Sequence, residues 1–138
     1  MTQEEKDLLI KDLCARLPYG VILNCCGIIG EKLTCIDEHG LINHDYDIDE
    51  VIPHLFSLSS MTKEQAKEMQ EIIGNPDDAC IFRKTGGLEL WLNSIDTDPT
   101  IWLDTIFEVQ DWLNRNHFDY RGLIERGLAI DCTNLNIY

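Results

Sequence analysis

The stretch that most constrains this chain lies near its end, between Trp112 and Ile130. Aromatic and aliphatic side chains are interleaved there with charged ones, so the segment must fold against an apolar surface. Gly122 and Gly127 mark two changes of backbone direction. The pattern predicts the end of a long helix, a turn, a short helix and a last strand. Such a segment closes a small domain, and we expect its removal to unfold the chain.

Three stretches have the apolar spacing of helices, over residues 2–17, 62–73 and 98–116. The first two begin with Thr followed three residues later by Glu or Gln, which is the pattern of a capping box. The third begins with Asp98 as its cap and Pro99 at the first helical position. On the first helix, Asp12 falls off the apolar face.

Short runs of apolar, β-branched and alternating residues predict strands, over 21–26, 32–36, 41–43, 79–83 and 88–92. The last two form a possible hairpin, although 88–95 also fits a helix. We interpret residues 27–30 as a turn because they begin and end with glycine. We interpret Pro53 as the boundary of an element, among the apolar residues Val51, Ile52, Leu55 and Phe56.

These elements predict an α+β fold, with about three helices packed on a small antiparallel β-sheet. The chain has 138 residues, which is the size of one ordinary domain. We find no internal repeat, low-complexity segment or long linker. Residues 1–138 are therefore expected to form a single compact domain.

The chain is strongly acidic, with 25 acidic and 11 basic residues, a net charge of −14 and a pI of about 4.4. Attraction to phosphate needs a basic surface, so this balance argues against direct nucleic-acid binding and against an anionic membrane as partner. An acidic surface that imitates nucleic acid, and so occupies the basic groove of a DNA-binding protein, stays open as an alternative.

The sequence also predicts a cytoplasmic location. No apolar run approaches the roughly 20 residues that cross a bilayer. Residues 1–7 are acidic and polar, unlike a signal peptide. The six cysteines are accordingly expected to be free thiols.

Three blocks of the sequence carry a family resemblance. They are Lys-Asp-Leu-Cys-Ala-Arg-Leu-Pro-Tyr-Gly-Val at 11–21, the segment 55–62, and His-Phe-Asp-Tyr-Arg-Gly-Leu-Ile at 117–124 with 127–129. Together they resemble small proteins of gut Bacteroidales and their phages that have no assigned activity. The resemblance spans most of the chain, and 74–98 matches least, as an insertion or a variable part would. It implies a phage or mobile-element context and supplies no catalytic residue.

The patterns that suggest a metal fail on spacing. Asp45, Asp47 and Asp49 are spaced like the start of a calcium loop, but Glu50 stands where that loop needs Gly and Phe56 where it needs Glu. Zinc ligands come in close pairs of Cys or His, and no such pair is present. Cys35, His39 and His44 flank one turn, but we interpret them as turn and loop residues.

The sequence predicts no cofactor and no catalytic residue. The segment 27–30 lacks the Lys and the helix start of a phosphate-binding loop. No local signature selects one Cys and one His as nucleophile and base.

The densest group of side chains able to recognise a ligand is His117, Asp119, Tyr120 and Arg121, and these are the candidate binding residues. Arg121 has the geometry to clamp a carboxylate or a phosphate. The alternative is structural, with Asp119 capping a short helix over 120–126. We favour the structural alternative, because Asp is a common residue at helix starts.

The resulting hypothesis is a non-enzymatic cytoplasmic accessory protein that binds a protein partner. In its sharper form, it is a phage or mobile-element factor that acts on a host protein. One alternative is an acidic nucleic-acid mimic that inhibits a DNA-binding protein, and another is a small hydrolase-like enzyme that uses Cys and His. A binding protein should show an exposed apolar patch, a mimic acids spaced like phosphates, and an enzyme a concave pocket with convergent titratable groups.

Overall fold

The structure of the chain is a computed structural model that describes residues 1–74, 79–84, 87–92 and 99–138, with side chains described for 1–74 and 105–138. Its helices are α1 (Gln3–Arg16), α2 (Lys63–Ile73) and α3 (Pro99–Arg115). Its strands are β1 (Ile22–Cys25), β2 (Ile28–Lys32), β3 (Val51–Ser57), β4 (Ala79–Lys84), β5 (Gly87–Leu92), β6 (Phe118–Asp119) and β7 (Ile130–Asp131). The predicted α+β class is confirmed.

The predicted helix starts are confirmed where the structure describes them. Thr2 Oγ1 accepts from the backbone N–H of Glu5 at 3.2 Å, and Glu5 Oε2 accepts from Thr2 N at 2.7 Å. The same reciprocal pair forms between Thr62 and Gln65 before α2. Pro99 is the first residue of α3, and its predicted cap, Asp98, lies outside the described residues.

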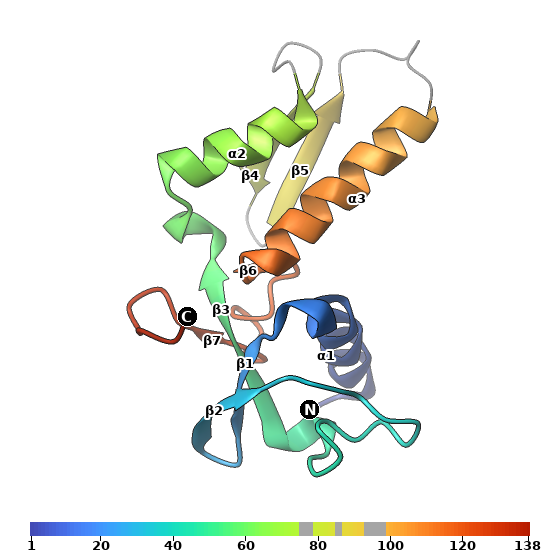
Figure 1. Cartoon of the computed structure of the whole chain (residues 1–138), viewed down its shortest axis with the longest axis vertical. Helices are drawn as coiled ribbons and strands as arrows, with labels where there is room; N and C mark the ends of the chain where they lie inside the picture. The colour runs from blue at the N-terminus through green and yellow to red at the C-terminus, as the bar shows by residue number, and fades with distance from the viewer. Residues whose placement is uncertain (75–78, 85–86, 93–98) are drawn as a thin grey trace.

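The main sheet has the order β2-β1-β3-β6, and β7 also pairs with β3 (Figure 1). β2, β1 and β3 are antiparallel neighbours, whereas β6 and β7 run parallel to β3. The sheet is therefore mixed and not purely antiparallel as predicted, because the chain returns from α3 in the direction of β3. β4 and β5, which follow α2 and precede α3 in the chain, form a separate antiparallel hairpin, as predicted, and lie behind the two helices in the view of Figure 1.

The central strand, β3, is the element that the sequence pattern missed. Pro53 lies inside it, not at a boundary. The carbonyl of Glu50 accepts from Cys26 N, so alternate residues from Glu50 onward direct their backbone groups at β1. Pro53 faces the other edge, where β7 begins to pair only at His54, so its missing N–H interrupts no ladder.

The β1–β2 hairpin also differs from its prediction. Strand β2 begins at Ile28, directly after a turn in which Cys26 and Gly27 have φ of 50° and 85°. Two positive φ values in succession fit the tight hairpin turn that follows strand twist. Gly30, predicted as the end of the turn, is instead skipped between Ile29 and Glu31 in the pairing with β1.

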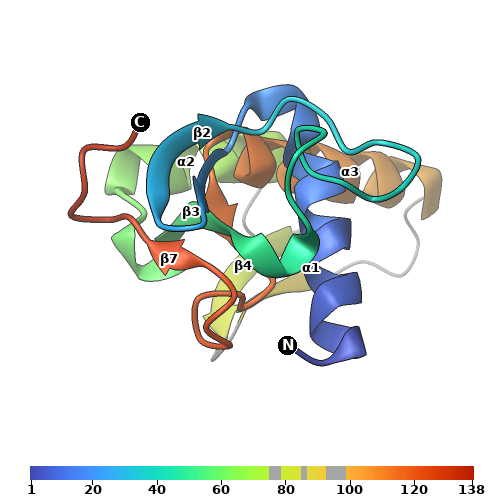
Figure 2. The ribbon, with the colours of Figure 1, turned by 90° about the horizontal axis from the view of Figure 1, so that it is seen from below.

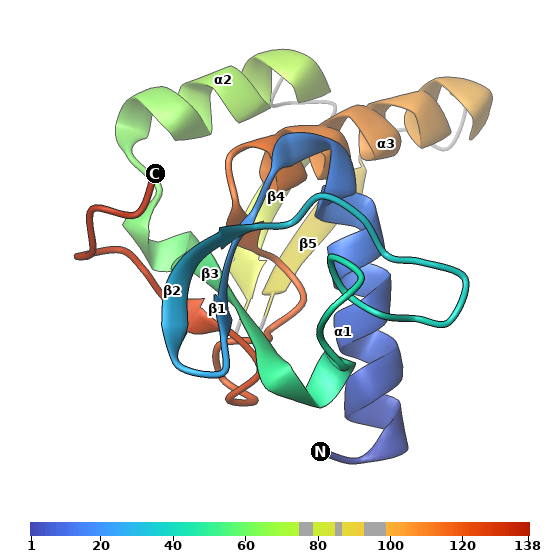
Figure 3. The same ribbon diagram turned by 60° about the horizontal axis from the view of Figure 1, so that its bottom comes forward.

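Among the residues with described side chains, the core consists of two apolar clusters. The first lies between α1 and the sheet, which lie side by side in Figures 2 and 3; its buried residues are Leu9, Leu13, Val21, Leu23, Cys25, Leu33, Ile42, Val51, Leu55, Leu123, Leu128 and Ala129. The second joins α2, α3 and β6, with buried Met61, Met69, Ile73, Val109, Trp112, Leu113 and Phe118. The C-terminal block supplies residues to both clusters, as its pattern predicts.

We expect Leu123→Ala to lower the free energy of unfolding by about 2–5 kcal/mol, because a fully buried Leu leaves a cavity when it is shortened. Leu135→Ala is the matched control, since Leu135 is 45% exposed. Urea denaturation of both variants measures the difference. An equal effect of the two substitutions would contradict the placement of the C-terminal block in the core.

Candidate functional site

Asp119 organises the segment after β6 through its carboxylate. Its Oδ1 accepts from the backbone N–H groups of Arg121 at 3.3 Å and Leu123 at 3.0 Å, and its Oδ2 accepts from Ile124 N at 2.9 Å. The predicted short helix over 120–126 does not form, and the segment folds as turns. Asp119 therefore caps a turn in place of a helix, and it is itself buried.

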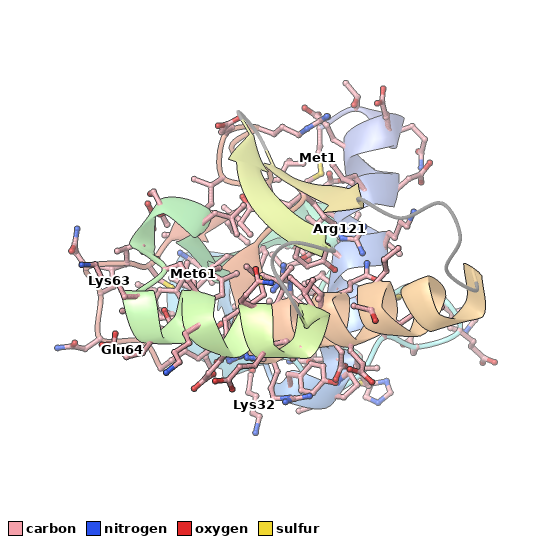
Figure 4. The ribbon with its side chains drawn as sticks, turned by 90° about the horizontal axis from the view of Figure 1, so that it is seen from above. Met1, Lys32, Met61, Lys63, Glu64 and Arg121 are labelled. Atoms are coloured by element: carbon pink, nitrogen blue, oxygen red, sulfur yellow. The ribbon has the colours of Figure 1, made fainter. Side chains whose placement is uncertain are left out.

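Arg121 belongs to a buried group of charges that we call the arginine–aspartate cluster, made of Asp12, Arg16 and Arg121. Arg121 Nε donates to Asp12 Oδ1 at 3.1 Å, and Arg16 Nε donates to Asp12 Oδ2 at 2.7 Å. Arg16 Nη2 also donates to the carbonyl of Phe118 at 2.7 Å. Figure 4 shows Arg121 directed into the molecule beside α1. The cluster thus joins α1 to the C-terminal block.

Asp12 and Arg16 are the residues that sequence reasoning missed. Both side chains are fully buried, although Asp12 was placed off the apolar face of the first helix. The available signal was their spacing with Leu9 and Leu13, since positions i, i+3, i+4 and i+7 share one face of a helix. An i, i+4 pair of opposite charge inside that face indicates a buried ion pair.

Tyr120 lies against both arginines. Its hydroxyl donates to Asn114 Oδ1 at 2.9 Å and accepts from Arg121 Nη2 at 3.1 Å. The guanidinium carbons of Arg121 and Arg16 lie 4.9 Å and 5.5 Å from the centre of its ring. These distances are within the range of cation–π attraction.

His117 connects the block to the last residue of the chain. It has a φ of 61°, and its ring stacks on that of Tyr138 with centroids 3.8 Å apart. The Tyr138 hydroxyl accepts from Ile22 N at 2.9 Å and donates to the carbonyl of His54 at 2.8 Å, which bridges β1 and β3. Burial, together with the positive charge of Arg16, lowers the pKa of His117 to about 4.

The structure thus brings all four predicted binding residues together, but Asp119, Tyr120 and Arg121 direct their polar groups at the protein itself, and the buried Nδ1 of His117 has no hydrogen-bond partner. Asp119 and Arg121 hold backbone and carboxylate partners, and Tyr120 packs on the guanidinium groups. This arrangement favours the structural alternative for the block. An exposed apolar surface lies elsewhere on the molecule.

That surface is the outer strand of the main sheet. All five residues of β2 are exposed, including Ile28 at 63% and Ile29 at 57%. Ile29 lies opposite Asn24, which lies opposite Ile52 on β3, so these three side chains form a row on one face of the sheet. Figure 3 shows β2 at the rim of the sheet, with β1 as its neighbour.

The remaining candidate groups are the acidic loop, residues 44–50, and the cysteines. In the part of the chain with described side chains, no three His, Cys, Asp or Glu residues gather as metal ligands would. Five of the cysteines are free thiols, and the sixth, Cys80, lies outside that part. No helix among the described residues has both the length and the apolar character to cross a bilayer.

We expect Asp12→Asn to lower the free energy of unfolding by about 3–5 kcal/mol, because it leaves two arginines, one of them fully buried, without the carboxylate that pairs them. Arg121→Ala should lower the free energy of unfolding by less, because Arg16 still pairs with Asp12. Lys11→Ala, an exposed change on the same helix, should stay within about 0.5 kcal/mol. If Asp12→Asn were as mild as Lys11→Ala in urea denaturation, the cluster would not stabilise the fold.

A second prediction concerns the stability of the fold at acidic pH. The pKa of His117 is about 4 in the folded chain against an ordinary 6.5, so the unfolded chain takes up the proton first. The stability that depends on neutral His117 is complete above pH 6.5 and is lost as the pH falls from 6.5 towards 4. In His117→Asn, which retains a residue that tolerates positive φ, this part of the loss should vanish.

Thermal melts at several pH values test this expectation. The melting temperature of the wild type should drop more steeply between pH 6.5 and 4 than that of His117→Asn. His39→Asn is the control, because the His39 side chain is 77% exposed. Parallel curves for wild type and His117→Asn would show that His117 is not the group responsible.

Comparison with models of protein families, with curated proteins and with solved structures finds no match for this chain. Proposals about its function therefore rest on the residues described above.

Proposed function

We propose that this chain is a small non-enzymatic protein that binds a partner protein through the outer edge of β2. The observation that carries the proposal is the exposure of Ile28 and Ile29 on a strand that pairs on one side only. The resemblance to proteins of gut Bacteroidales and their phages supplies the setting, in which the partner is a host protein.

An open strand edge is a feature that soluble proteins usually protect, because its unpaired backbone groups attract other strands. Among the described residues, none outside β1 forms a hydrogen bond with the backbone of residues 28–31. The neighbouring row of Ile29 and Ile52 adds apolar surface to that edge. A backbone edge next to apolar side chains is the surface that strand addition uses.

The thiols give little support to the hydrolase alternative. Burial raises the pKa of Cys25 and of Cys132 to about 11 each, so both stay protonated at neutral pH. The pKa of Cys26 is also raised, by burial and by the charge of Glu50. A protonated thiol is a poor nucleophile.

The acidic loop gives little support to the nucleic-acid mimic. Asp37 Oδ1 accepts from His39 N at 2.9 Å and Leu41 N at 3.0 Å, and Asp49 pairs with Lys6 at 2.5 Å. Asp47 and Glu50 form a capping box with each other. These carboxylates bind groups within the protein, whereas the phosphates that a mimic imitates are presented outward to a partner.

The test is affinity purification from the native host with the wild type and two variants. Ile29→Asp places a charge in the apolar row, and Phe107→Asp makes the same change at another exposed apolar residue on α3. A partner recovered with the wild type should be lost with Ile29→Asp and kept with Phe107→Asp. If both variants retain the partner, the β2 edge is not the binding surface.

A further inference from the structure

The outer edge of β2 is closed at one end by a side chain. Leu33 N donates to Val21 O, just before β1, so the preceding residue, Lys32, directs its backbone groups to the outer side. There the Asn43 amide donates to the Lys32 carbonyl at 2.9 Å. The strand edge that a partner can approach is therefore limited to residues 28–31, which we call the β2 edge. By the same alternation, the backbone groups of Glu31 face β1.

Two carboxylates lie at this edge. Glu31 is part of it, and Glu50 Oε1 lies 3.8 Å from the thiol of Cys26 in the adjoining turn. Lys32, the last residue of β2, is exposed and follows Glu31. The exposed isoleucines therefore have two carboxylates beside them and one ammonium group at the far end of the strand.

The two faces of the β2 edge differ in chemistry. Ile29 pairs with Asn24, and Glu31 pairs with Leu23, the residue next to Asn24. Because neighbouring residues of a strand point to opposite faces, Ile29 and Glu31 lie on opposite faces. Ile28 pairs with Cys25 and therefore shares the face of Glu31, so a strand added here meets Ile29 and Ile52 on one face and Ile28 with Glu31 on the other.

We propose that the β2 edge receives an extended segment of the partner in which Lys or Arg alternates with apolar residues. This rests on the proposed function and adds the chemical class of the partner. The apolar side chains of such a segment pack against the row of Ile29 and Ile52, and its basic side chains face Glu31. A second copy of this chain is a poorer occupant, because each copy carries a net charge of −14.

The experiment uses two short synthetic peptides, one alternating Lys with Val and one alternating Glu with Val. Each is titrated into the isotope-labelled full chain, and the backbone amide signals are followed by NMR. The Lys peptide should shift the signals of residues 28–31 and bind at least about tenfold more tightly than the Glu peptide. This preference should weaken in roughly 0.5 M salt, because charge attraction is screened.

Two charge reversals provide a matched pair of variants. Glu31→Lys should remove the preference for the Lys peptide, whereas Glu64→Lys, the same charge change at the start of α2, should leave it intact (Figure 4). Equal binding of both peptides, binding by neither, or equal effects of the two variants would overturn the proposal. Dimer formation by the wild type that Ile29→Asp abolishes would also overturn it in favour of a second copy.

The outcome separates this inference from the proposed function. If Ile29→Asp loses the native partner but the peptides show no charge preference, partner binding at the β2 edge stands and only the basic segment is wrong. If Ile29→Asp keeps the native partner and neither peptide shifts residues 28–31, both proposals fail. Where the native partner is lost with Ile29→Asp, a photo-crosslinker at position 29 of the otherwise wild-type chain identifies the contacting segment, which must be basic and extended for this inference to hold.

Discussion

The rest of the structure depends on the carboxylate of Asp12, which receives one arginine from its own helix and one from the far end of the chain. Arg16 and Arg121 both donate to it, and Arg16 also holds the carbonyl of Phe118. Phe118 in turn lies in the second apolar cluster and begins the strand that pairs with β3. One fully buried and one partly buried guanidinium group on the same carboxylate fix where α1 meets the C-terminal block, since an ion pair has directional partners and apolar packing does not.

This arrangement favours a structural role for the four residues with the most chemistry in the sequence. The carboxylate oxygens of Asp119 accept hydrogen bonds within a turn, and the Tyr120 ring lies against the two guanidinium groups. His117 is stacked on Tyr138, whose hydroxyl joins two strands. The polar side chains of this segment hold it against the rest of the fold through an ion pair, hydrogen bonds and ring stacking.

The sequence allowed the helices to be predicted because their signals are local. The capping boxes at Thr2 and Thr62 act within one turn, and so does Pro99. The central strand was missed because a proline in a strand is acceptable only when the facing edge is free, which depends on β1 and β7. The β2 edge was missed for a similar reason: a glycine-bounded segment gives the same local pattern as a turn or as a bulged strand. The buried charges also depend on distant residues, since Arg121 lies far from Asp12 along the chain.

Asn43 gives the sheet edge a definite length. Four residues of strand extend about 13 Å, which leaves room for only a few main-chain hydrogen bonds with an added segment. In the proposed complex, a ladder that short would leave most of the affinity to side chains. Because differences in affinity between related complexes lie mostly in the rate of dissociation, a longer exposed strand would hold the proposed partner for longer. One asparagine in a loop would thereby limit the residence time of that partner.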